Sequence, residues 1–402
     1  MRKRKLTDLD DLRDMRRWFA ALALVSTSIA ACGQPPASPL TRSPSPSAAH
    51  SSTTPSRSPT ALAAFPVAAD VTCPDLSSFG LSRYLERPSD SNRHEAVLCD
   101  THQLDRPLAL HDLDSAQTIG FVSDTVIGYV QQSGIDLSHA SGAIKTLDLT
   151  SQATSVVASQ AGFVGPVAWS HDQSMLAYTT YAGSAKDFWL KRGAGPAIAL
   201  VPPVQVFGRG GTEGDEDLVA FSPDDQFVLF VDTSINRLQV FRTSDGGEAY
   251  KAPSGQGGFR TMATWAHQGD HMYFRNDNGI YQWDPTSGIS SFASGVKWEY
   301  PLFSPDDRYL VYTVWDAAGT THIVVRDMTN STTGSSPTMR LSSEFLSNVI
   351  LLERVTKPCD NQGPCGPFAL TEDTRTLRLD SGAEGQLPMP AGWGLDAVLV
   401  AH

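Results

Sequence analysis

Short apolar runs that end in an aromatic residue recur along the chain from residue 175 to 312, each after a polar turn motif. In two copies the turn motif reads Ser-Pro-Asp-Asp, at 222–225 and 304–307. Proline presets φ at the first turn position and aspartate tolerates the second, so each motif predicts a tight turn between two strands. Consecutive apolar positions after the turn indicate a strand that is buried on both faces. The four runs are Met175–Tyr178, Phe227–Phe230, His271–Phe274 and Tyr309–Tyr312.

The aromatic residues that end these runs are 52, 44 and 38 residues apart, which is a loose repeat. A repeat of roughly 40–50 residues has the size of one four-stranded propeller blade. Weaker copies extend the pattern on both sides, at 119–158 and 349–380. Residues 96–100 and 107–111 match the third and fourth strands of a blade that lacks its first two, and 395–401 match a final strand without a partner. We expect the two chain ends to complete one blade together.

The pattern therefore predicts an all-β fold, a β-propeller of about seven four-stranded blades whose last blade is closed by N- and C-terminal strands. Six or eight blades remain open. The 32 glycines and 26 prolines fit the many turns of such a fold. A hydrophobic content of 41% is sufficient for a real core.

At these repeats the chain resembles the TolB-like, or WD-like, family of propeller repeats. That family's signature reads aromatic-Ser-Pro-Asp-Gly, followed by an apolar strand that ends in Tyr or Phe. The resemblance covers about residues 120–385, and it departs from the signature at Asp225 and Asp307, which stand where the family has glycine. It implies the propeller fold and export from the cytoplasm, and it does not carry over the role of TolB itself.

The N-terminal region predicts export and a lipid anchor. An apolar run over 18–31 follows an arginine pair at 16–17 and ends at Cys32. This is the pattern of a secretory signal, and the run is shorter than the about 20 residues of a membrane span. Residues 29–32 resemble the bacterial lipobox, which implies that Cys32 becomes the first mature residue and is acylated. The alternative is an ordinary signal peptide with an incidental cysteine.

The predicted organisation has three parts: a signal peptide over 1–31, the lipidated cysteine with a disordered linker over 32–64, and the propeller domain over 65–402. The linker is rich in Pro, Ser and Thr, a composition that cannot bury a core. The first residue of the protein could be Met1 or Met15. A start at Met1 gives a long leader in which the arginine pair resembles a twin-arginine export signal.

Charge and export together narrow the location and the partners. The formal net charge of −12 repels phosphate backbones, so no nucleic-acid partner is expected. The expected location is the bacterial cell envelope, with the lipid as the contact to a membrane. The residue after the acylated cysteine is Gly33 rather than Asp, which favours the outer membrane over the inner one. The periplasmic side of that membrane is the expected position. The cell surface stays open, and a monomer is expected.

Four cysteines remain beside the acylated one, in a compartment that favours disulfides. Cys359 and Cys365 bracket a short loop and are predicted to form a clip. Cys73 and Cys99 would then pair and fasten the segment before the first blade to the closing blade. Free thiols or a metal site are the alternative.

No residue pattern predicts catalysis, a cofactor or a metal site. The chain has no G-x-S-x-G motif, and the acidic stretch over 211–217 lacks the spacing of an EF-hand. His267 and His271 are predicted to be turn residues rather than a helical metal motif.

A partner-binding face is predicted where second strands lead to third strands and where one blade leads to the next. Exposed tryptophan beside charge is typical of recognition surfaces, although these tryptophans could instead pack between blades. The function that follows is a lipid-anchored interaction or scaffold module that binds an envelope protein or a peptidoglycan-associated partner. The alternative is a glycan-binding or carbohydrate-active propeller that uses its central funnel. The predicted partner-binding residues are Arg275, Asp277, Trp298, Glu299, Trp315 and Asp316.

Overall fold

The computed structural model describes most of the chain after residue 60. The described residues are 61–88, 95–133, 140–182, 185–205, 218–232, 237–253, 263–276, 278–296, 298–315, 321–338, 340–358, 368–390 and 393–400. They belong to one unit, which spans Pro59–His402. Among them, no helix is long and apolar enough to cross a membrane.

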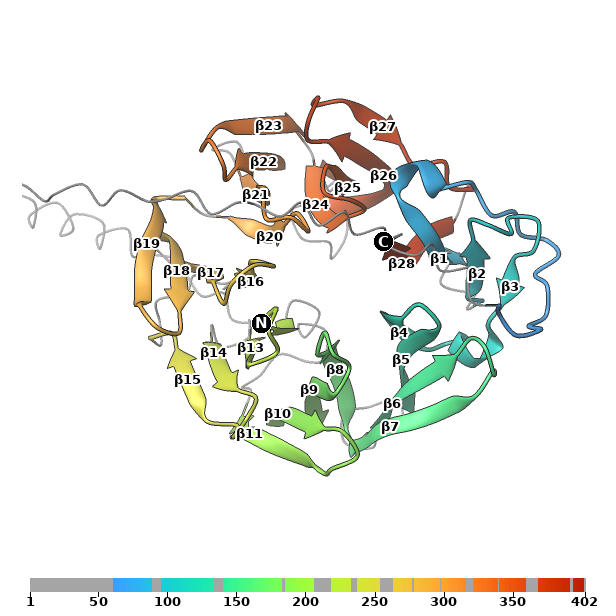
Figure 1. Cartoon of the computed structure of the whole chain (residues 1–402), viewed down its shortest axis with the longest axis horizontal. Helices are drawn as coiled ribbons and strands as arrows, with labels where there is room; N and C mark the ends of the chain where they lie inside the picture. The colour runs from blue at the N-terminus through green and yellow to red at the C-terminus, as the bar shows by residue number, and fades with distance from the viewer. Residues whose placement is uncertain are drawn as a thin grey trace, which may run out of the picture. The chain divides into compact units, whose positions relative to one another are not determined.

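The described residues form seven four-stranded antiparallel sheets that follow one another around a ring (Figure 1). The prediction of an all-β propeller with seven blades is confirmed. In each blade the first strand lies nearest the centre of the ring and the fourth strand lies outermost (Figure 1). Two short 3-10 helices, η2 (Ser77–Phe79) and η3 (His111–Leu113), accompany the strands.

Each blade has its strands in order from the centre outward. Blade 1 contains β28 (Trp393–Val400), β1 (Leu81–Pro88), β2 (Val97–Asp100) and β3 (Leu108–Ala109). Blade 2 contains β4 (Gln117–Ser123), β5 (Val126–Ser133), β6 (Ser141–Asp148) and β7 (Thr154–Ala161). Blade 3 contains β8 (Phe163–Trp169), β9 (Met175–Ala182), β10 (Ala185–Arg192) and β11 (Ala197–Gln205). Blade 4 contains β12 (Leu218–Phe221), β13 (Phe227–Asp232), β14 (Arg237–Arg242) and β15 (Glu248–Lys251).

The remaining three blades follow in chain order. Blade 5 contains β16 (Ala263–Trp265), β17 (Met272–Asn276), β18 (Gly279–Asp284) and β19 (Gly288–Ser294). Blade 6 contains β20 (Glu299–Phe303), β21 (Tyr309–Trp315), β22 (Thr321–Asp327) and β23 (Thr333–Thr338). Blade 7 contains β24 (Arg340–Phe345), β25 (Ile350–Pro358), β26 (Phe368–Arg378) and β27 (Glu384–Gln386).

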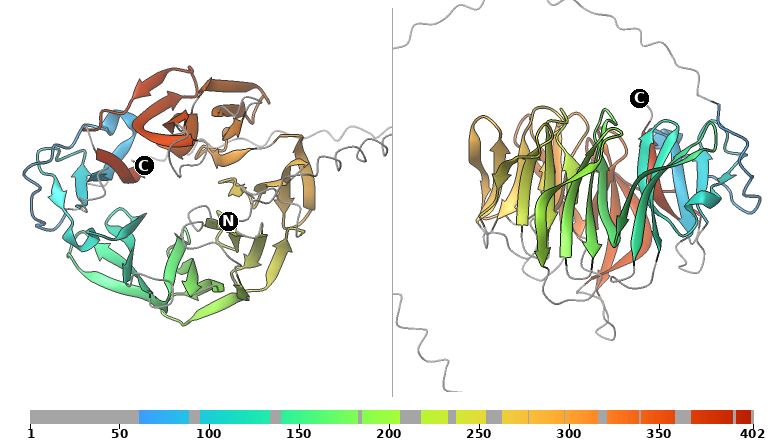
Figure 2. Two further views of the ribbon diagram at one scale, coloured as in Figure 1. Left: turned by 180° about the vertical axis from the view of Figure 1, so that it is seen from behind. Right: turned by 90° about the horizontal axis from the view of Figure 1, so that it is seen from below.

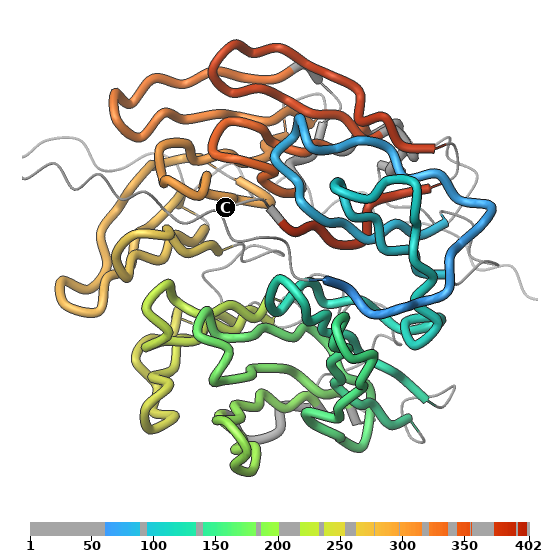
Figure 3. Tube along the Cα trace, turned by 45° about the vertical axis from the view of Figure 1, so that its right-hand side comes forward, coloured from blue at the N-terminus to red at the C-terminus, as the bar shows by residue number. Residues whose placement is uncertain are grey.

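Blade 1 closes the ring with strands from both ends of the chain, as predicted. β28 pairs antiparallel with β1, from Leu81 opposite Val400 to Pro88 opposite Trp393, and Figure 3 shows these blue and red segments side by side. The expected number of strands from each chain end is wrong, however. The N-terminal segment supplies three strands rather than two, because β1 is the second strand of this blade.

Blade 7 also differs from the prediction. The stretches 368–371 and 375–380, expected as separate strands, lie largely in the single strand β26. The first strand β24 and the short outer strand β27 were not predicted. Both are polar, with the sequences Arg-Leu-Ser-Ser-Glu-Phe and Glu-Gly-Gln, so neither has the apolar run that marks a buried strand.

The core lies between the blades, since consecutive residues of a second strand pack against opposite neighbours. All six residues of β13 are buried. Val228 packs with Ala177 of blade 3, and Leu229 packs with Met272 of blade 5. This alternation is the physical reason for the continuous apolar runs in the sequence.

The predicted tight turns are confirmed at both Ser-Pro-Asp-Asp motifs. The Ser222 hydroxyl donates to Asp224 Oδ1 at 2.7 Å and accepts a bond from the backbone N–H of Phe227 at 2.9 Å. Asp225 has φ 60° and Asp307 has φ 57°, which is the left-handed conformation that explains why glycine is usual at this position.

The segment before β1 is fastened to blade 1. The predicted disulfide between Cys73 and Cys99 is present, with its Cα atoms 5.6 Å apart, and both cysteines are buried. Val67 bridges to Leu108, which gives the outer strand β3 a partner. The disulfide and the bridge together attach residues 67–73 to two strands of the closing blade.

The ring has two faces, which we name by their connections. The turn face carries the turns from first to second strands, such as 222–226, and from third to fourth strands, such as 284–288. The loop face carries the connections from second to third strands and from blade to blade. Ala63 donates to Leu149 O at 2.8 Å beside the turn after β6, and Val400 ends β28 opposite the start of β1. Both described ends of the chain therefore lie at the turn face (Figure 2).

Candidate functional site

The structure brings four of the six predicted partner-binding residues into one network between blades 5 and 6. Arg275 Nη1 donates to Trp298 O at 3.2 Å and lies 3.8 Å from Glu299 Oε1. Trp315 Nε1 donates to Glu299 Oε2 at 2.8 Å. β17, β20 and β21 place these side chains near the loop face, where two second strands end and a first strand begins.

This network is largely internal. Trp298 is fully buried, with its ring 5.5 Å from that of Tyr312, and the side chains of Arg275 and Glu299 are 13% and 11% exposed. Trp315 is only half-buried. The network therefore holds two blades together and presents one tryptophan, fixed by a hydrogen bond to a carboxylate, at its edge.

Other sequence predictions lie outside the described residues. These are Cys32, the Cys359–Cys365 clip, Asp277, Asp316 and the acidic stretch 211–217.

A second charged contact, not anticipated from the sequence, joins blades 3 and 4. Lys186 Nζ lies 2.7 Å from Asp232 Oδ1, and the two side chains are 2% and 1% exposed. Lys186 also lies over the Tyr181 ring, 5.0 Å from its centroid. The one signal of this contact in the sequence was Asp232 at the end of an apolar second strand, since a buried charge needs a partner.

At the turn face, Asp225 and Asp307 each bind the turn of the preceding blade. The Asp225 carboxylate accepts bonds from the backbone N–H groups of His171 and Asp172 at 2.8 and 2.9 Å, and His171 Nδ1 lies 2.8 Å from it. The Asp307 carboxylate accepts the same pair of bonds from His267 and Gln268. Glycine in this position would offer no side-chain acceptor for these bonds.

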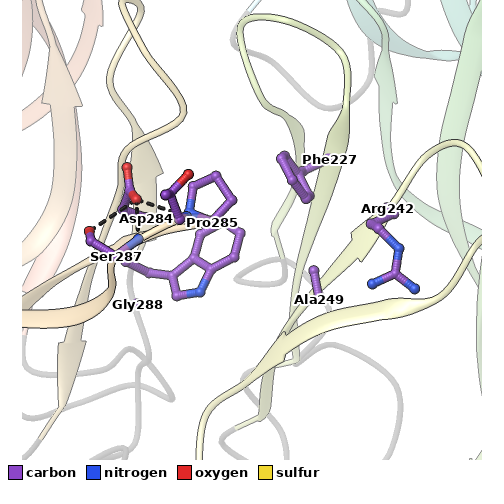
Figure 4. Close-up of a pocket in the computed structure, with 9 residues that line it drawn as sticks. Phe227, Arg242, Ala249, Asp284, Pro285, Ser287 and Gly288 are labelled. Atoms are coloured by element: carbon purple, nitrogen blue, oxygen red, sulfur yellow. Dashed lines mark hydrogen bonds between the residues drawn. The ribbon is translucent and has the colours of Figure 1, made fainter.

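A pocket of about 490 Å³ opens at the same face between blades 4 and 5. Figure 4 shows Phe227, Arg242 and Ala249 on one side of it and the turn after β18 on the other. The residues that line it are Phe227, Arg242, Ala249, Trp283, Asp284, Pro285, Thr286, Ser287 and Gly288.

The pocket has an aromatic base and polar walls. The Trp283 ring lies 5.5 Å from Phe227 in an edge-to-face arrangement and 5.9 Å from Tyr250 in a stacked one. Burial raises the pKa of Tyr250 to about 12. On the far wall Asp284 Oδ1 accepts bonds from the backbone N–H groups of Thr286 and Ser287 and from the Ser287 hydroxyl. The backbone bond from Ser287 leads the causes that hold the pKa of Asp284 below its ordinary value.

One carboxyl in blade 1 is buried without a partner. Glu86 in β1 is fully buried between Val97 of β2 and Leu395 of β28, and neither of its oxygens has a hydrogen-bond partner among the described residues. Burial raises the pKa of Glu86 to about 7. The group therefore favours its neutral form in the folded protein.

The predicted enzyme alternative uses the central funnel of the ring, around which the innermost strands lie. Two carboxylates of these strands are held by other side chains. Asp396 in β28 lies 2.6 Å from Arg87 Nε, and Glu299 in β20 belongs to the network between blades 5 and 6. Within the described ranges, no group of three or more His, Cys, Asp and Glu side chains could hold a metal ion.

Several solved β-propellers are similar to this chain. A putative 6-phosphogluconolactonase from Bacteroides fragilis is 13% identical, with 81% of this chain and 99% of that chain covered and a TM-score of 0.48. TolB from Acinetobacter baumannii is also 13% identical, with 80% and 84% covered and a TM-score of 0.43. A prolyl endopeptidase is 12% identical, with 78% of this chain but 51% of that chain covered and a TM-score of 0.50.

At these identities the similarity shows the fold alone. No family model matches the sequence, and no curated protein matches it. The seven four-stranded sheets define this chain as a seven-bladed β-propeller. They confirm the fold that the predicted TolB-like resemblance implies, and a TolB and a putative TolB are among the similar structures.

Proposed function

We propose that this chain is an exported, lipid-anchored β-propeller that binds a protein partner in the cell envelope through its loop face. The observation that carries the proposal is the position of Trp315. It is half-buried at the end of a second strand, and Glu299 fixes its indole N–H from the adjacent first strand. Aromatic side chains held rigidly in advance bind partners at a low cost in conformational entropy.

The positions of the chain ends fit an anchored orientation. Ala63 and Val400 lie at the turn face, so a lipid on Cys32 would connect to the propeller from that side. The loop face with Trp315 would then be the side that remains accessible. The buried disulfide Cys73–Cys99 agrees with export, since such bonds persist in oxidising compartments.

The anchor is tested by labelling cells with a palmitate analogue. We expect the full-length protein to take up the label and to fractionate with membranes, and we expect Cys32→Ala to lose both properties. A labelled Cys32→Ala protein, or an unlabelled wild type, would refute lipid anchoring. Density fractionation of the two membranes then tests the outer-membrane location.

Partner binding is tested by cross-linking in whole cells, followed by capture of the full chain. Trp315→Ala should reduce the yield of one cross-linked protein at least fivefold (on the order of 1 kcal/mol in binding). Trp189→Ala is the matched control, because Trp189 is also half-buried and donates to a neighbouring side chain, Thr180, at 2.8 Å. Equal yields from both variants contradict the proposal. Cross-linked material that glycosidases remove and proteases do not would support the glycan-binding alternative instead.

A further inference from the structure

The pocket between blades 4 and 5 combines an aromatic base, a cation and hydroxyl groups. Its aromatic lining comes from Phe227 and Trp283, which pack edge-to-face and are 9% and 4% exposed. One wall carries Arg242, and the other carries Thr286, Ser287 and Asp284, whose carboxylate accepts the Ser287 hydroxyl. The pocket lies at the turn face, so it is separate from the loop face of the proposed function.

Arg242 keeps hydrogen-bonding capacity toward the pocket. Its Nε and Nη2 groups donate to the carboxylate of Asp245 at 3.1 to 3.3 Å, and Nη1 makes a long bond of 3.4 Å to Glu248 O. A guanidinium has five N–H donors, so these contacts leave one N–H on each of Nη1 and Nη2 for a ligand. The side chain is 44% exposed and can therefore be reached from solvent.

The guanidinium lies close to the turn beneath it. A Cβ atom on Gly247 would lie 2.1 Å from Arg242 Nη2, so a larger residue there would displace the end of this side chain. Asp245 holds the same group from the turn and accepts a bond from the backbone N–H of Gly247 at 2.8 Å. The cation is thus held in place before any ligand arrives.

We propose that this pocket binds an aromatic ring that carries a carboxylate. The ring would contact Phe227 and Trp283, where edge-to-face and offset contacts between rings are favourable. The carboxylate would accept the two remaining N–H groups of Arg242, the arrangement in which arginine recognises carboxylates most strongly. The hydroxyl of Thr286 lies on the opposite wall and can donate to a further polar group on the ring.

The proposal makes Asp245 a competitor of the ligand. Its carboxylate and the ligand's carboxylate share one guanidinium, so neutralising Asp245 should strengthen binding of the anion. A pocket that merely accepts apolar rings would not respond in this way. This sign separates recognition of a carboxylate from adventitious binding.

The experiment measures affinity for N-acetyl-L-phenylalanine and for its neutral amide by calorimetry on the mature propeller. The acid should bind at least tenfold more tightly than the amide, a difference of about 1.4 kcal/mol. Arg242→Gln should abolish the preference, and Asp245→Asn should increase affinity for the acid severalfold with no change for the amide. Arg378→Gln is the matched control, because Arg378 forms the corresponding exposed pair with Asp380 in blade 7.

A second arm distinguishes the source of the carboxylate. A tetrapeptide that ends in phenylalanine is compared with its C-terminal amide and with the free acetylated amino acid. Tighter binding of the peptide acid assigns the pocket to a polypeptide carboxyl terminus, whereas tighter binding of the free compound assigns it to a small molecule. Equal affinity for acid and amide, loss of the preference in Arg378→Gln, or no binding at all overturns the proposal.

Discussion

Asp225 in blade 4 accepts a hydrogen bond from the backbone N–H of His171 in blade 3, at a distance of 2.8 Å. The residue that allows the tight turn of one blade therefore also binds the turn of the blade before it. Asp307 does the same for His267 across the joint between blades 5 and 6. The departure of this chain from the Ser-Pro-Asp-Gly signature is thus explained by contacts between blades.

Asp225→Gly should lower the free energy of unfolding by about 2–5 kcal/mol. Glycine relieves the left-handed strain at φ 60°, worth about 1 kcal/mol. It also removes an acceptor of two backbone bonds, each worth about 1.5–3 kcal/mol when charge-assisted. Urea denaturation of the purified protein measures the difference.

Gln173→Gly is the matched control for this change. Gln173 occupies the equivalent turn position in blade 3 with φ 61°, and its side chain is exposed. Its replacement by glycine should leave stability unchanged or raise it by up to about 1 kcal/mol. If both variants are equally destabilised, the contact between blades is not the reason for aspartate at position 225.

Glu86 should make stability depend on pH. Its pKa is about 7 in the folded protein against an ordinary value of 4.5. As pH rises from 4.5 to 7 the unfolded chain loses this proton while the folded protein keeps it, so the free energy of unfolding falls across that window. Above pH 7 the loss stays constant at up to about 3 kcal/mol, from about 1.4 kcal/mol per unit of pKa.

Glu86→Gln should remove this dependence and raise stability above pH 7, while the two proteins stay close below pH 4.5. Denaturation midpoints measured at pH 4.5, 6 and 8 check it. The exposed Glu95 gives the control Glu95→Gln, which should track the wild type at every pH. If the difference in midpoint between the wild type and Glu86→Gln stays the same from pH 4.5 to 7, the assignment to Glu86 is contradicted.

The disulfide Cys73–Cys99 should stabilise the closing blade. It links residues 26 apart, and a loop of this size is typically worth about 2–4 kcal/mol. A Cys73→Ala/Cys99→Ala variant should unfold at lower urea and should lose the part of the wild type's response to reductant that comes from this bond. A Cys359→Ala/Cys365→Ala variant should retain the part of the response to reductant that comes from Cys73–Cys99. If this variant loses all sensitivity to reductant, the stabilising bond is not Cys73–Cys99.

The repeats made the propeller predictable because a strand buried on both faces must be apolar at successive positions, as in β13 and β21. The same rule explains what was missed. β1 is buried, but it carries Arg83, Glu86 and Arg87, and Arg83 is satisfied by Asp100 of β2 at 2.9 Å. No local pattern can reveal that a charged strand is buried when its partner comes from another strand.

The candidate site shows the same limit. Tryptophan beside charge predicted a surface at Arg275, Trp298, Glu299 and Trp315, and the four residues do lie together. Whether such a group is exposed depends on how blade 6 packs on blade 5, which is a long-range property. The pocket at Arg242 and Trp283 was not predicted at all, because its two walls come from turns of different blades.

Lys186 and Asp232 provide the last test, since they form a buried ion pair between blades 3 and 4. Lys186→Met keeps most of the side-chain volume but leaves the Asp232 carboxylate buried without its lysine. We expect a loss of about 3 kcal/mol, because the Asp232 carboxylate loses its buried lysine and keeps the electrostatic interaction with Arg237. Lys186→Met/Asp232→Leu should recover most of that loss, since a similar apolar pair removes the buried charge as well. The difference between the double variant and the sum of the single variants, measured by urea denaturation, gives the coupling energy. A double variant as unstable as that sum would mean that the two side chains act independently, and that the charges do not join these blades.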